Sequence, residues 1–311
     1  MLELRWATAG TVIVALCAAL WRGAHPPRGT TGGRAALARY AAHPSAVLAA
    51  AALITLYVLS ALAPWLATHD PIAILERSMS NHAPTHGFLF GTDYAGRDVL
   101  SRVLYGARIS LSVALLATSI AVVVGTLWGI TAGFCGGKLD ALMMRIVDAF
   151  LAIPRIVLLI AIGTLWAPLS ISALIIVLGL TAWFETSRLV RAEVLSIKDR
   201  EMVVAARALG ASDVAIVKRH VLPNVLTPVF VAATLAVAGV IINEAALSFL
   251  GIGVADPTPS LGNIIHDGTP YLASAWWVAL FPGITLVITA LAYNLAGDGL
   301  RDAMDPRQVD R

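Results

Sequence analysis

The chain has 311 residues, of which 58% are hydrophobic and 13% are charged, with a mean hydropathy of +0.80 and a net charge of +3. An average soluble domain carries about 25% charged residues, and so few charges could not cover the apolar surface of a soluble protein of this size. The apolar excess lies in several long runs, which excludes a soluble enzyme, a disordered chain and a protein with one membrane anchor. The composition predicts an all-α, polytopic membrane helical bundle.

Six core helices are expected along the chain, because a helix that crosses the hydrocarbon core needs about 20 mostly apolar residues. In chain order, the apolar segments are 46–67, 109–134, 140–184, 225–250 and 274–296. The third is long enough for two helices and contains a proline at residue 168, where the chain can turn. A weaker segment, 6–21, is interpreted as an extra N-terminal helix, with a surface-lying or cleaved segment as the alternative.

Lysine and arginine are distributed unequally between the loops. Residues 22–45 carry four arginines and no acidic residue, and residues 185–222 carry seven basic residues. With these segments in the cytoplasm, that side collects sixteen basic residues and the opposite side four. Cytoplasmic loops of membrane proteins carry such an excess of positive charge. We therefore expect a cytoplasmic C-terminus, with 185–222 as the main cytoplasmic feature.

Residues 201–224 predict a helix–turn–helix hairpin within that cytoplasmic segment. Gly210 suits the end of the first helix, because glycine adopts left-handed backbone angles at little cost. Ser212 is a suitable N-cap for a second short helix, and Pro223 is expected to break that helix before the next span. Small side chains in the first helix would let another protein approach closely, but a connecting loop packed on its own bundle explains them equally well.

The hairpin resembles the EAA loop of binding-protein-dependent ABC importer permeases. The family pattern is Glu-Ala-Ala, three residues, glycine, nine residues, a hydrophobic position, one residue, then Leu-Pro. The matching residues here are Ala205, Ala206, Gly210, Leu222 and Pro223. The chain departs from the pattern at Val204, in place of the glutamate, and at His220, in place of the hydrophobic residue. The resemblance implies that an ATPase couples to this loop through Ala205, Ala206, Leu209, Gly210, Ala211, Ser212 and Pro223.

Five further segments resemble the C-type permease subunit of dipeptide, oligopeptide and nickel ABC importers. They are GTDYAGRDVLSRVLYGARISL (91–111), AGFCGGKLDALMMRIVDAFLAIP (132–154), EAALSFLGIG (244–253), PSLGNIIHDG (259–268) and NLAGDGLRDAMDPR (294–307). The resemblance covers about residues 45–310 and implies the type I ABC importer transmembrane fold. The implied divisions are an extra helix and basic loop at 1–44, a first core helix and external loop at 45–107, an ABC transmembrane type-1 domain at 108–298 and a cytoplasmic tail at 299–311.

The resemblance also implies partners and a substrate class. The partners would be a second homologous permease subunit, two cytoplasmic ATPase subunits and an external solute-binding protein, within the lipid of a bacterial or archaeal plasma (inner) membrane. No nucleic acid and no cofactor are expected. The substrates would be dipeptides or oligopeptides, with nickel or another small solute as the alternative.

Nothing in the sequence indicates catalysis by this chain. The nucleotide-binding pattern GxxxxGK[ST] is not matched around Gly137 and Lys138, which lack the upstream glycine and the following serine or threonine. We expect a non-catalytic subunit whose partners hydrolyse ATP. A stand-alone secondary transporter or channel is the competing hypothesis, and it would predict intramembrane ion sites or inverted repeats.

The spans and the external loop contain three further candidate functional features. Glu244, beside Asn243, is an acidic residue at membrane depth, where it could line the pathway, fix a helix pair or form a structural hydrogen bond. Pro154 should kink its helix and could act as a hinge. Residues 91–108 predict a turn and an amphipathic helix whose charged side chains turn away from its apolar face.

Overall fold

The computed structural model describes residues 39–74, 77–166 and 169–304, so the helix expected at 6–21 lies outside the described residues. Across these ranges the chain is helical and has no β-strand, and its only bridges are isolated pairs at Thr92–Asp98 and Leu169–Val254. Five helices are long and apolar enough to cross a membrane, and a bent pair of helices makes a sixth when it is counted as one span. The predicted all-α membrane bundle is confirmed, with five to six spans where six core helices were expected.

The spanning helices are α3 (Pro44–Ala61), α5 (Val99–Cys135), the bent pair α6 (Gly137–Leu151) and α7 (Arg155–Leu165), α8 (Ile171–Lys198), α11 (Leu222–Phe249) and α13 (Trp277–Met304). The shorter elements are α4 (Ala63–Leu66), η1 (Arg77–Met79), α9 (Glu201–Ala208), α10 (Asp213–Ile216), η2 (Val217–Val221), α12 (Leu261–Gly268) and η3 (Thr269–Tyr271).

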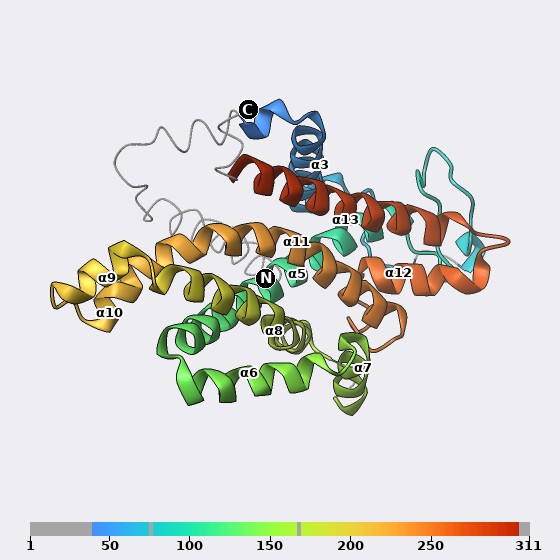
Figure 1. Cartoon of the computed structure of the whole chain (residues 1–311). Coiled ribbons are helices and arrows are strands. Elements are labelled where there is room, and N and C mark those ends of the chain that lie inside the picture. Colours follow the sequence, from blue (N-terminus) through green and yellow to red (C-terminus); the bar gives the residue numbers. More distant parts are fainter. Residues whose placement is uncertain (1–38, 75–76, 167–168, 305–311) are drawn as a thin grey trace.

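The long helices lie side by side, with α9 and α10 at one end of the bundle and α12 at the other (Figure 1). Buried residues of α5, α8 and α11, such as Ala117, Leu178 and Ile241, form the largest apolar core. On the other side of α11 lies α13, which in turn contacts α3. The hairpin and the α12 region are therefore held at opposite ends of one packed scaffold.

Close packing between α5 and α8 depends on glycines spaced by four residues in α5. A Cβ added to Gly125, Gly129 or Gly133 would lie 2.6, 2.6 and 2.9 Å from atoms of α8. Small residues at this spacing let two membrane helices approach until their backbones touch. Sequence reasoning overlooked this pattern, although GxxxG spacing in an apolar helix is a recognisable signal.

Two predicted helix boundaries are wrong. The second span begins at Val99 instead of residue 109, because Asp98 caps it by accepting a hydrogen bond from the amide of Ser101. The resulting helix has 37 residues. At Pro154 the chain does more than kink, since α6 ends at Leu151 and α7 leaves at 79°. Pro154 has no amide hydrogen to continue α6 and its position precedes the first residue of α7.

Candidate functional site

The hairpin expected at 201–224 is present as α9, a turn and α10. Its inner face is apolar: Val203, Ile216 and Val221 are completely buried, in one cluster with Val194 of α8 and Val225 of α11. Arg207 lies 5.8 Å from the centre of the Phe134 ring of α5. The hairpin is therefore packed firmly on the ends of three spanning helices, so that a force applied to it would reach them directly.

The outer face of the hairpin carries exposed apolar side chains, beside the exposed ion pair of Arg207 and Asp213. Leu209 is 88% exposed, Val214 65% and Val204 56%. Gly210 stands at the turn with φ of +81°, and a Cβ there would have no atom within 4 Å. Glycine is thus required by the backbone angle and not by lack of space. The turn closes when the amide of Ala211 donates to the carbonyl of Ala206 at 3.1 Å.

The expected break at Pro223 is wrong. Ser212 caps α10 as predicted, accepting a hydrogen bond from the amide of Ala215, but the chain then stays helical through η2 into α11. Pro223 is the second residue of α11 and lies directly after η2. The preceding turn, η2, is a π-helix, a rare local widening that is frequent at functional sites. One helical rod thus runs from the hairpin into a membrane span.

Glu244 is fully buried and joins three parts of the chain. Its Oε2 accepts a hydrogen bond from Ser110 of α5 at 2.7 Å, and its Oε1 accepts one from Ser248 at 2.8 Å. Each serine oxygen in turn accepts a backbone amide, from Leu261 and Val254 respectively. The carboxylate therefore ties α5, α11 and the segment that leads to α12, and it does not reach the subunit surface.

Three glycines allow this close arrangement around Glu244. A Cβ on Gly106 would lie 3.1 Å from the backbone of Ser260, one on Gly253 would lie 2.2 Å from the Ser248 hydroxyl, and one on Gly262 would lie 2.3 Å from the Ala245 carbonyl. The motifs EAALSFLGIG and PSLGNIIHDG are thus brought into contact with each other and with α5. Neighbouring Asn243 instead donates to the Gly239 carbonyl of its own helix, at 2.7 Å.

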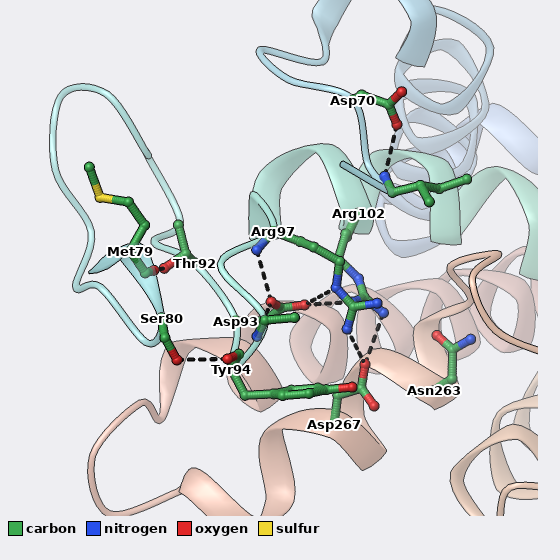
Figure 2. A network of polar contacts seen from close by, with 12 residues as sticks. Asp70, Met79, Ser80, Thr92, Asp93, Tyr94, Arg97, Arg102, Asn263 and Asp267 are labelled. Carbon is green, nitrogen blue, oxygen red and sulfur yellow. Dashed lines mark hydrogen bonds and ion pairs between the residues drawn. The ribbon is translucent and has the colours of Figure 1, made fainter. Parts of the chain in front are cut away.

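At the α12 end of the bundle, two arginines and two aspartates form a buried cluster (Figure 2). Asp93 accepts hydrogen bonds from Nε of Arg97, at 2.7 Å, and from Arg102. Asp267 of α12 accepts one from each arginine, both at 3.0 Å. Because the four charges balance and are hydrogen-bonded, they can be buried without an isolated charge. The cluster fastens the loop before α5 to α12.

The cluster corrects the predicted amphipathic segment at 91–108. Arg97, Asp98 and Arg102 do not turn away from the apolar face towards water; they are 6%, 0% and 0% exposed. Burial lowers the pKa of Arg97, but the carboxylates of Asp93 and Asp267 outweigh it and the pKa is raised. Burial raises the pKa of the Asp267 carboxyl, against the lowering effect of Arg102 and Arg97.

The candidate residues are therefore distributed over three places. Ala205, Leu209, Gly210 and Ser212 are exposed on the hairpin, while Ala206, Ala211 and Pro223 are partly buried at its sides and base. Glu244 lies inside the bundle, near the opposite end. Pro154 is exposed at the break between α6 and α7. The structure thus gathers the proposed coupling residues in one hairpin and separates them from the other candidates.

Comparison with known proteins identifies the family. Residues 125–310 match the family described as binding-protein-dependent transport system inner membrane component, and residues 33–84 match the N-terminal TM domain of oligopeptide transport permease C. A dipeptide transport system permease protein of Bacillus subtilis is 38% identical over 82% of this chain and 79% of its own length. A di/tripeptide transport system permease protein of Pseudomonas aeruginosa is 39% identical over 86% and 89%.

The fold also matches a solved structure. The MetNI methionine ABC transporter, in inward-facing conformations, superposes with a TM-score of 0.57 at 23% identity, covering 66% of this chain and 98% of the other. Family membership favours an importer component over a stand-alone transporter or channel. The chain belongs to the binding-protein-dependent transport system inner membrane component family and is a multi-pass permease of the ABC importer type.

Proposed function

We propose that this permease forms half of the translocation pathway for dipeptides and oligopeptides, which an external solute-binding protein delivers. The observation that carries the substrate class is the 38% and 39% identity, over most of both chains, to permeases of dipeptide and di/tripeptide transport systems. A second, homologous permease subunit completes the pathway. Relatives this similar, matched over more than four fifths of this chain, are expected to share the kind of solute that they carry.

Two cytoplasmic ATPase subunits supply the energy, one docking on the hairpin of each permease, and this chain does not hydrolyse ATP. Three exposed apolar side chains on the hairpin, Val204, Leu209 and Val214, support this assignment, because water-exposed apolar side chains on a short helix pair are suited to a groove in a partner. The rigid continuation from α10 through η2 to α11 supports transmission of ATPase movement to the membrane. The C-terminus lies on the same, cytoplasmic side.

Co-purification tests the composition of the complex. Tagged protein extracted from its native membrane in a mild detergent should bring a second multispan subunit and one or two ATPases with nucleotide-binding motifs, identified by mass spectrometry. A chain that purifies alone, with the hairpin intact, would contradict the proposal and favour a self-sufficient transporter.

Replacing Leu209 with alanine tests the docking surface. Leu209→Ala should weaken ATPase retention at least about tenfold, as expected for an interface side chain worth about 1.4 kcal/mol. The matched control is Leu89→Ala, which removes the same atoms from a leucine that is 56% exposed in the loop before α5. Equal retention of the ATPase by both variants would refute docking at the tip.

A further inference from the structure

A positively charged side chain lies at membrane depth on the surface of this subunit, at the break between α6 and α7. Arg155 is partly exposed, and its Nη2 donates to the carbonyl of Leu178 in α8 at 3.2 Å. Leu178 is about 10 Å along α8 from its first residue, within the roughly 30 Å of a hydrocarbon core counted from that end. Charged groups at such depth face a bundle interior or a water-filled cavity and mark substrate pathways.

The guanidinium has unused hydrogen-bonding capacity. Its Nε is buried without a partner, and no carboxylate lies within 4.0 Å of it in the described parts of the chain. The acidic group that acts on it electrostatically is Glu185, which is exposed on α8. Seven residues separate Leu178 from Glu185, so both lie on one face of α8, about 10 Å apart along its axis. A cation and an anion thus stand near each other without forming an ion pair.

The backbone at the break also requires water or protein beside it. Residues 152–154 are exposed, and in the described structure the amides of Arg155 and Ile156 have no hydrogen-bond acceptor. Unpaired backbone at membrane depth does not face lipid; it is found where protein covers it or where it borders an aqueous cavity. The surface that carries Arg155 therefore faces the interior of the assembled importer.

We propose that Arg155 and Glu185 form a dipolar site in the translocation pathway for the charged ends of a short peptide. Arg155 binds the terminal carboxylate and Glu185 binds the terminal ammonium group. A guanidinium suits this role because its planar donors match both oxygens of a carboxylate. Two opposite charges beside each other suit a substrate that carries both charges at once. This inference rests on the peptide substrate class proposed above.

Uptake by the complete importer, reconstituted in vesicles with its saturated binding protein, tests the site. The probes are L-alanyl-L-alanine, its C-terminal amide and its N-acetyl form, each supplied at a concentration that fills the binding protein. Wild type should carry the unmodified dipeptide fastest. Arg155→Gln should slow its uptake about tenfold and remove the preference over the amide, whereas Arg155→Lys should keep part of that preference. Glu185→Gln should remove the preference over the N-acetyl form.

Two measurements separate this site from general damage. ATPase stimulation by the loaded binding protein should stay within about twofold of wild type in every variant, because assembly and coupling are untouched. Arg188→Gln, which removes an exposed arginine of α8 that pairs with Asp148 of α6, should retain wild-type uptake and preferences. If Arg155→Gln does not assemble, Arg155→Lys and Glu185→Gln carry the test.

The two proposals fail in different ways. Unchanged rates and unchanged preferences in assembled Arg155 and Glu185 variants would overturn the dipolar site and leave the peptide importer intact. A wild-type importer that carries none of the three probes would overturn the substrate class, and this inference with it.

Discussion

Replacing Gly129 with alanine should force α5 and α8 apart. The added methyl group would lie 2.6 Å from both the Ser187 carbonyl oxygen and the Val190 Cβ of α8. Neither atom is the end of a flexible side chain, so relief requires the two helices to separate. Overpacking of this kind costs about 1–3 kcal/mol. Alanine in place of glycine within a helix returns about 1 kcal/mol, so the net loss of unfolding free energy should be about 0–2 kcal/mol.

The matched control is Gly239→Ala in α11, where an added Cβ has no atom within 4 Å. Both substitutions gain the same helix propensity, so the difference between them isolates the packing cost, expected at about 1–3 kcal/mol. Unfolding of the purified protein in mixed detergent micelles can be followed by tryptophan fluorescence. Trp128 and Trp183 lie 4.9 Å apart, centre to centre, across the α5–α8 contact. If Gly129→Ala were as stable as Gly239→Ala, the close approach inferred for these helices would be wrong.

Three other substitutions test single features of the structure. Ser110→Ala should lower the unfolding free energy by about 1–3 kcal/mol, because buried Glu244 loses a hydrogen-bond donor. The control is Ser119→Ala, whose hydroxyl bonds only within α5 and which should change the unfolding free energy by less than about 0.5 kcal/mol. Equal effects of the two substitutions would contradict the stabilising role of the Ser110–Glu244 hydrogen bond. Gly210→Val should strain the turn by about 1–2 kcal/mol, because valine is disfavoured at a positive φ. It should abolish transport and complex assembly, while circular dichroism shows that the spans are still folded. Unchanged transport and assembly would refute a role for the turn. Burial raises the folded-state pKa of Asp267, so its contribution to stability is complete below the ordinary carboxyl pKa of about 3.9 and is lost as pH rises through the raised value. The melting temperature of wild type should therefore fall relative to that of Asp267→Asn as pH rises across that window. A wild-type melting temperature that rose relative to that of Asp267→Asn would contradict the raised pKa.

The positions of the spans could be predicted from the sequence because each is a local property. A run of about 20 apolar residues crosses a bilayer whatever surrounds it. The hairpin was equally local: a glycine at the turn and a serine cap each act within a few residues of themselves, and both took the predicted roles at Gly210 and Ser212. Helix ends were predicted less well: Asp98 caps α5, which therefore begins ten residues before the predicted start.

What the polar residues do was decided by the tertiary structure, because burial and pairing depend on partners far along the chain. Arg102 is bonded to Asp267, 165 residues away, and Glu244 to Ser110, 134 residues away. Periodicity on one helix assigned Arg97 and Arg102 to a polar face, but α12 covers that face and supplies the opposite charge. Sequence by itself determined which segments enter the membrane and which hairpin leaves it. Only the packing of distant helices determined which charges are buried in pairs and which, like Arg155, are left with free hydrogen-bonding capacity. The reason is that a charge within the membrane is stable only where the fold brings it a partner or water.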